Sequence, residues 1–141
     1  MSKLRPYSIQ TQHLRFAGLT KEWTPEFGGG SLSKYLVKHG IEHIFELGDT
    51  DGVRNRLLDL HFFKELYEDV DWIVILKYWR TLGEEEDAGQ SYLKAVDTAI
   101  SGEVDESLLD AMSAVGIFCN DSYLLDAGLE ITKKCLESKE L

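Results

Sequence analysis

Apolar residues recur every three or four positions from Ser31 onward, and this part of the chain contains no proline. Such spacing places apolar side chains on one face of an α-helix. The periodicity predicts about six helices, which cover residues 31–47, 51–67, 70–82, 84–100, 105–119 and 122–138. The segment 70–82 is apolar on nearly every side, which indicates a central helix that lies between others. The predicted fold class is therefore all-α.

The first thirty residues differ from the rest of the chain. They hold both prolines, Pro6 and Pro25, and they end in the glycine triplet 28–30. A short mixed stretch, residues 13–19, fits either a strand or a helix. Proline lacks a backbone N–H, and glycine loses much conformational freedom on folding, so neither favours the interior of a helix. We therefore predict an irregular N-terminal segment over residues 1–30 and one α-helical repeat domain over residues 31–141.

The composition limits the classes of function. The 141 residues include 15 Lys and Arg against 25 Asp and Glu, which gives a formal charge of −10. Binding to nucleic acid or to an anionic membrane needs clustered basic residues, and the sequence has no such cluster. No apolar run approaches the roughly 20 residues of a membrane-spanning helix, and the first residues lack the apolar core of a secretory signal. We therefore expect a cytoplasmic protein without a nucleic-acid or membrane partner. Its two cysteines, Cys119 and Cys135, are expected to be buried thiols.

The dipeptide Leu-Gly occurs at residues 47–48 and again at 82–83, a separation of 82 − 47 = 35 residues. A period of this length is typical of stacked helix pairs. Residues 72–95 resemble a tetratricopeptide repeat, whose two helices carry large and small residues at set positions. The matching residues are Trp72, Ile75, Trp79, Gly83, Ala88, Tyr92 and Ala95. Leu76 departs from the pattern, which has a small residue at that position.

A second, degenerate copy of the repeat follows 112 − 72 = 40 residues later, with an insertion at 101–107. Its matching residues are Met112, Val115, Gly116, Cys119, Gly128, Thr132 and Cys135. The resemblance implies antiparallel helix hairpins that stack into a right-handed superhelix. A plain six-helix bundle is the alternative architecture.

Residues 35–66 resemble the helical linker that precedes the superhelical repeats of STAND-class signal-transduction NTPases. The residues that carry this likeness are His39, His43, Gly48, Leu57, Leu58, Asp59, Phe62 and Phe63. No G-x4-G-K-[ST] loop occurs in the sequence, so the ATPase portion of that class is missing. The resemblance implies the arm or sensor portion of a larger signalling assembly.

These features together predict a non-enzymatic protein-protein interaction module, which acts as a scaffold or sensor and needs no cofactor. In tetratricopeptide arrays the first helix of each pair lines a concave face. The resemblance places these binding residues on that face: Ile73, Lys77, Arg80, Thr81, Ser113, Ile117 and Asn120. Because the chain is acidic, we expect a protein or peptide partner of basic character. Self-association is left open.

The alternative function is a small α-helical zinc-dependent hydrolase. Residues 39–43, His-Gly-Ile-Glu-His, match the H-x-x-E-H pattern, in which two histidines one helical turn apart bind zinc and the glutamate acts as a base. Such a site needs a third protein ligand, for which Asp59 and Glu65 are the candidates. In the competing interpretation His43 packs at a helix interface and His39 is partly exposed.

Overall fold

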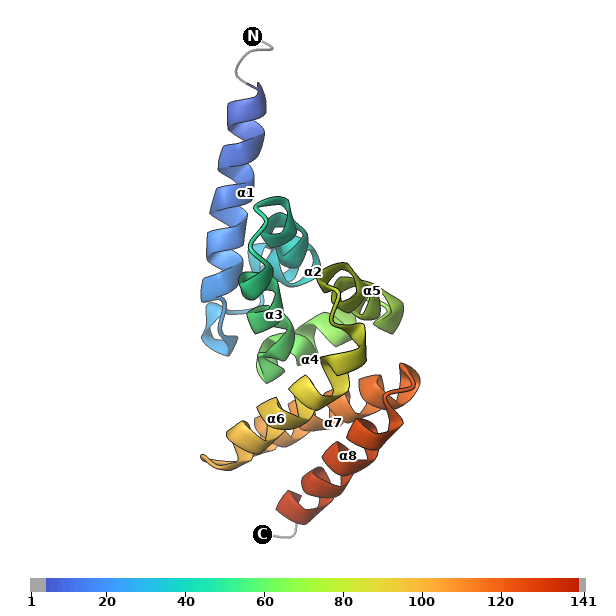
Figure 1. The fold of residues 1–141 in the computed structure, drawn as a ribbon. Coiled ribbons are helices and arrows are strands. Elements are labelled where there is room, and N and C mark those ends of the chain that lie inside the picture. The colour runs from blue at the N-terminus through green and yellow to red at the C-terminus, as the bar shows by residue number, and fades with distance from the viewer. Residues whose placement is uncertain (1–4, 140–141) are drawn as a thin grey trace. The chain divides into compact units, whose positions relative to one another are not determined.

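The structure of the protein is a computed structural model that describes residues 5–139. No β-strand occurs within this range, and the prediction of an all-α fold is confirmed (Figure 1). The eight α-helices of these residues are α1 (Arg5–Glu22), α2 (Ser31–Glu46), α3 (Thr50–Leu58), α4 (Leu60–Asp69), α5 (Trp72–Leu82), α6 (Ala88–Ile100), α7 (Glu106–Asp121) and α8 (Leu125–Lys139). Two short 3-10 helices, η2 (Pro25–Phe27) and η3 (Glu85–Asp87), precede α2 and α6. No helix among residues 5–139 is long and apolar enough to cross a membrane.

The helix count differs from the predicted six partly because the segment 51–67 forms two helices rather than one. Helices α3 and α4 meet at Asp59, whose backbone is extended. The Oδ1 atom of Asp59 accepts a hydrogen bond of 3.0 Å from the backbone N–H of Phe62. A carboxylate at this position satisfies an N–H group that has no partner inside the helix. Asp59 therefore begins a new helix.

The prediction of an irregular segment over residues 1–30 is wrong for residues 5–22, which form α1, whereas residues 1–4 lie outside the described range. Pro6 lies in the first turn of α1, where a missing N–H breaks no helix hydrogen bond. Ala17 and Thr20 are buried, and α1 packs along α2. This helix carries few apolar residues, so its stability comes from packing rather than from a strong sequence pattern.

Two compact units divide the chain, residues 1–56 and residues 57–141. The domain boundary predicted between residues 30 and 31 therefore falls inside the first unit.

In the first unit, α2 buries one face, formed by Leu36, Val37, Ile41 and Ile44. The indole Nε1 of Trp23 donates a hydrogen bond of 3.0 Å to Ser33 Oγ, and Arg56 Nη1 donates one of 3.1 Å to the carbonyl oxygen of Trp23. These bonds hold the connection between α1 and α2 in place.

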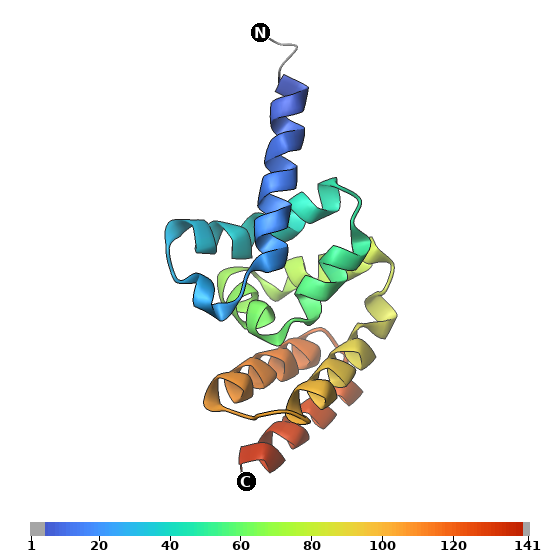
Figure 2. The ribbon, with the colours of Figure 1, turned by 90° about the vertical axis from the view of Figure 1, so that its left-hand side faces the viewer.

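In the second unit, α7 packs against α4 and also along α8, which in turn packs against α6 (Figure 2). Phe63, Trp79, Tyr92 and Phe118, which come from α4, α5, α6 and α7, fill the space between these helices and are fully buried. Tyr92 meets the other three rings edge to face at centroid distances of 5.2 to 5.8 Å. The indole Nε1 of Trp79 also donates a hydrogen bond of 3.1 Å to Tyr92 Oη. This aromatic cluster joins the four helices.

Helix α5 is less central than its sequence predicts. It buries Ile75 and Trp79, but Ile73 is 53% exposed, so α5 has one outer face. It does not pack along α6, and the two helices meet where Trp79 contacts Tyr92. Residues 72–95 therefore do not form the closely packed hairpin that a tetratricopeptide repeat contains. The α7–α8 pair does pack closely along its length.

Candidate functional site

The binding residues predicted on the first repeat all lie on α5. Ile73, Lys77, Arg80 and Thr81 are exposed and follow one side of the helix. The guanidinium Nε of Arg80 donates a hydrogen bond of 2.9 Å to Glu85 Oε2 in η3. The hydroxyl of Thr81 donates a hydrogen bond of 2.9 Å to the carbonyl oxygen of Lys77. This face of α5 is polar except for Ile73.

The binding residues predicted on the second repeat lie on α7. Ser113 Oγ is 3.4 Å from Cys135 Sγ of α8, and the side chain of Asn120 lies against Gly128 of α8. Ile117 is 52% exposed. Helices α5 and α7 do not pack along each other, so a shared groove for the two predicted sets stays a prediction.

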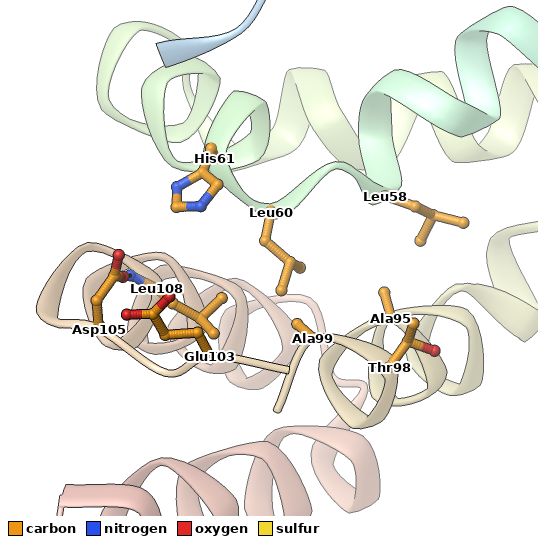
Figure 3. Close-up of a pocket in the computed structure, with 9 residues that line it drawn as sticks. All are labelled: Leu58, Leu60, His61, Ala95, Thr98, Ala99, Glu103, Asp105 and Leu108. Atoms are coloured by element: carbon orange, nitrogen blue, oxygen red, sulfur yellow. Dashed lines mark hydrogen bonds between the residues drawn. The ribbon is translucent and has the colours of Figure 1, made fainter. Parts of the chain in front are cut away.

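A groove of about 360 Å³ in the second unit was not predicted from the sequence (Figure 3). It lies between the beginning of α4 and helix α6, and the segment that leads into α7 closes one end. Its lining residues are Leu58, Leu60, His61, Ala95, Thr98, Ala99, Glu103, Asp105 and Leu108. The three leucines and two alanines form most of the walls, to which Thr98 adds a hydroxyl, whereas His61, Glu103 and Asp105 gather at one end (Figure 3).

The polar end of the groove is acidic. Asp105 is the N-cap of α7, and its Oδ1 accepts a hydrogen bond of 2.8 Å from the backbone N–H of Leu108. The Nδ1 atom of His61 lies 3.5 Å from Ser107 Oγ. Both Glu103 and Asp105 are exposed, so their negative charges can attract a cationic group at this end. The sequence feature that could have indicated this acidic site is the pair Glu103 and Asp105 within the 101–107 insertion.

A second polar cluster lies in the first unit. The Nδ1 atoms of His13 in α1 and His43 in α2 are 2.8 Å apart, and the Oη of Tyr35 lies 2.7 Å from His43 Nε2. Phe16 stacks on the ring of His43 with centroids 5.1 Å apart. Partial burial, followed by repulsion from His13, lowers the pKa of His43 below its usual 6.5. The neutral imidazole of His43 is therefore favoured, and His43 packs at a helix interface.

The H-x-x-E-H residues do not form a set of zinc ligands. The Nδ1 atom of His39 lies 3.4 Å from Glu42 Oε2, and both ring nitrogens of His43 face other partners. Asp59, one of the two proposed third ligands, caps α4 instead. Among residues 5–139, no group of three or more His, Cys, Asp or Glu side chains is arranged to hold a metal ion. The geometry thus does not support the zinc hydrolase.

Both cysteines are buried thiols, as predicted. Burial raises the pKa of Cys119 to about 12. The Sγ of Cys135 lies 3.7 Å from the carbonyl oxygen of Leu109, within the contact between α7 and α8. A thiol with so high a pKa is a poor nucleophile at neutral pH, because the thiolate is the reactive form. We therefore assign Cys119 to packing rather than to catalysis.

No protein family, no curated protein and no solved structure matches this chain. The function must therefore be inferred from the geometry of its own residues.

Proposed function

We propose that this chain is a non-enzymatic protein-protein interaction module whose groove in the second unit binds an extended peptide segment of a partner protein. The observation that carries the proposal is that apolar walls and an acidic end occur in the same groove. The bound segment has an aliphatic side chain between Leu58, Leu60 and Leu108. Next to it, a Lys or Arg lies beside Glu103 and Asp105.

The apolar walls supply most of the binding free energy. Leu60 and Leu108 are each only 7% exposed, so they form a firm surface rather than mobile side chains. Burial of one aliphatic side chain contributes about 1.5–3 kcal/mol. Each exposed ion pair adds at most about 1 kcal/mol. These contributions sum to at most about 5 kcal/mol before the entropic cost of association is subtracted, so an isolated peptide binds only weakly, with a Kd of about 1 mM or higher.

Charge determines which segments bind. The chain carries a formal charge of −10, and the groove places two carboxylates at one end. A basic segment is attracted over a distance of about one Debye length, whereas an acidic segment is repelled. The association rate should therefore fall as the salt concentration rises.

The tetratricopeptide likeness supports the same class of function for the α7–α8 pair. An added Cβ at Gly116 would lie 3.2 Å from Thr132 Oγ1, and one at Gly128 would lie 2.9 Å from Asn120 Cγ. These glycines allow the two helices to approach closely, as in stacked helix pairs. We extend the proposal to a scaffold or sensor within a cytoplasmic signalling assembly, which the likeness of residues 35–66 to a STAND linker implies.

The proposal is tested by selecting random nine-residue peptides on phage against the full chain. We expect enrichment of an aliphatic residue followed within two positions by Lys or Arg. Enriched peptides should lose binding to Ala95→Phe, which fills the groove, and should bind at least fivefold more weakly to Glu103→Lys. Circular dichroism establishes that both variants fold.

Two matched controls separate the groove from general effects. Ala114→Phe adds the same ring to a half-buried alanine of α7 outside the groove, and Glu86→Lys makes the same charge change in η3. Both control variants should bind the selected peptides as the unchanged chain does. If no peptide is enriched, or if the enriched peptides bind Ala95→Phe normally, the proposed function is wrong.

A further inference from the structure

One face of α8 is apolar and exposed. Leu125, Leu129 and Leu136 are 53%, 67% and 57% exposed, and their spacing of four and seven residues aligns them along one side of the helix. The opposite side of α8 is buried against the rest of the second unit, through Ala127, Gly128, Ile131 and Cys135. Three exposed leucines in one line differ from the isolated apolar residues that every protein surface carries.

Helix α7 continues this apolar face. Its residues Val115 and Phe118 are buried in the core, while Gly116 meets α8. Helical periodicity then places Ile117, which is 52% exposed, on the side of α7 that faces away from α6. The same reasoning places the leucine line of α8 on that side. We call the surface formed by Ile117, Leu125, Leu129 and Leu136 the outer face of the α7–α8 hairpin.

The spacing along α8 is that of a two-helix seam. Leu125, Leu129, Thr132 and Leu136 are separated by four, three and four residues, which is the a/d pattern of paired helices. The residues that flank such a seam determine the orientation of the pair through their charges. On α8, Asp126 follows Leu125, and Lys133 follows Thr132.

The charges of α8 suit a second copy of the same helix. The chain as a whole is strongly acidic, yet α8 carries three acidic and three basic residues, namely Asp126, Glu130, Glu137, Lys133, Lys134 and Lys139. When two copies of α8 run antiparallel with their seams in register, Asp126 of each lies beside the partner's Lys133. Opposite charges therefore meet twice in one symmetric contact.

We propose that the outer face of the α7–α8 hairpin binds the same face of a second copy of this chain, with the two α8 helices antiparallel. A helix of 15 residues is about 22 Å long, and two adjacent helices are about 20 Å wide. The contact therefore buries roughly 900 Å² in total, which is below the usual size of a stable interface. The dimer is accordingly weak, with a Kd on the order of 100 µM.

Sedimentation equilibrium of the full chain between about 10 µM and 1 mM tests this proposal. We expect a monomer at the low end and a growing fraction of dimer at the high end, with a Kd on the order of 100 µM. Leu129→Asp should raise the Kd more than tenfold, because it buries two carboxylates at the contact. Since Leu129 is exposed, this variant should retain the circular dichroism of the unchanged chain.

Charge reversal tests the antiparallel register. Asp126→Lys places two lysines side by side, and Lys133→Asp places two aspartates side by side, so each variant alone should dimerise at least threefold more weakly. An equimolar mixture of the two variants restores both opposite-charge pairs, and its association should recover. Glu65→Lys on α4 and Lys94→Asp on α6 make the same charge changes at exposed positions outside the outer face and should leave the Kd unchanged.

Three results would overturn the proposal. The chain could remain a monomer throughout the concentration range, which would leave the outer face to a different occupant. Dimerisation could persist in Leu129→Asp, which would place the contact elsewhere. The mixed variants could fail to recover, which would exclude the antiparallel register. None of these results depends on whether the groove binds a peptide.

Discussion

The packing of α1 on α2 depends on one glycine. Gly40 of α2 lies against Thr20 of α1, and a Cβ at Gly40 would overlap the hydroxyl and methyl of Thr20 and lie 2.8 Å from its Cβ. Thr20 is fully buried, and its Oγ1 donates a hydrogen bond of 2.6 Å to the carbonyl oxygen of Phe16. Rotation of the side chain would break this bond and would not move the Cβ. Gly40→Ala therefore cannot be accommodated without a shift of one helix.

The change in the free energy of unfolding caused by Gly40→Ala follows from two opposing contributions. Overpacking of a close contact costs about 1–3 kcal/mol, and the rigidity of Thr20 places Gly40→Ala at the upper end of that range. Alanine stabilises a helix interior relative to glycine by about 0.5–1 kcal/mol. The net loss in the free energy of unfolding is thus about 2 kcal/mol. This corresponds to a factor of about 30 in the folding equilibrium.

Gly18 of α1 is the matched control, because nothing lies within 4 Å of a Cβ added there. Gly18→Ala should stabilise the protein by about 0.5–1 kcal/mol through helix propensity alone. Urea unfolding followed by circular dichroism measures both variants, and native-state hydrogen exchange of α2 amides assigns the effect to the first unit. Adding Thr20→Gly to Gly40→Ala should recover at least about 1 kcal/mol relative to additivity. Equal stability of Gly40→Ala and the unchanged chain would refute the reasoning.

Three further predictions concern buried or partly buried groups. Because folding lowers the pKa of His43, the unfolded chain binds a proton at this residue more readily than the folded chain does. The free energy of unfolding should therefore fall as the pH drops through 6.5 and level off below the folded pKa. Thermal melts from about pH 8 to about pH 5 measure this decrease, and the part due to His43 should be absent in His43→Gln. The thiol of Cys119 should resist a disulfide reagent at about pH 8 and react once the chain is unfolded in urea, since burial raises its pKa to about 12. Tyr92→Phe should destabilise the second unit by about 1–3 kcal/mol, because it leaves the buried Nε1 of Trp79 without its hydrogen-bond acceptor. Urea unfolding measures this loss, and an unchanged midpoint of the unfolding transition would contradict the hydrogen bond between Trp79 and Tyr92.

The sequence predicted the helices of the second unit better than the first helix of the chain. Helices α5 to α8 lie close to their predicted ranges because strong apolar periodicity and clear capping residues, such as Asp105 and Gly83, mark them. Helix α1 was not predicted, since its apolar residues are few and Pro6 suggested a break. Burial of Thr20 against Gly40 stabilises it, and this contact joins residues 20 positions apart that no local pattern connects.

The candidate groove, like α1, depends on contacts between distant parts of the sequence and was not predicted. The alternation of large and small residues in 72–95 predicted a closely packed hairpin, but α5 does not pack along α6, and Trp79 of α5 contacts Tyr92 of α6. The space beside α6 is instead a groove, which receives Leu58 and Leu60 from an earlier part of the chain and Glu103 and Asp105 from a later part. Residues so far apart in the sequence leave no common pattern from which their meeting could be predicted.

The sequence alone determined that the chain is helical, that its two cysteines are buried and that its surface is acidic. Helical periodicity can be read from neighbouring residues, and the net charge is a sum over all residues, so neither requires knowledge of the tertiary structure. Only the tertiary structure decided which helices pack together, where the groove lies and that the leucines of α8 remain exposed. Those outcomes depend on competition among all the apolar faces for burial, and within residues 5–139 the apolar stripe of α8 stays exposed.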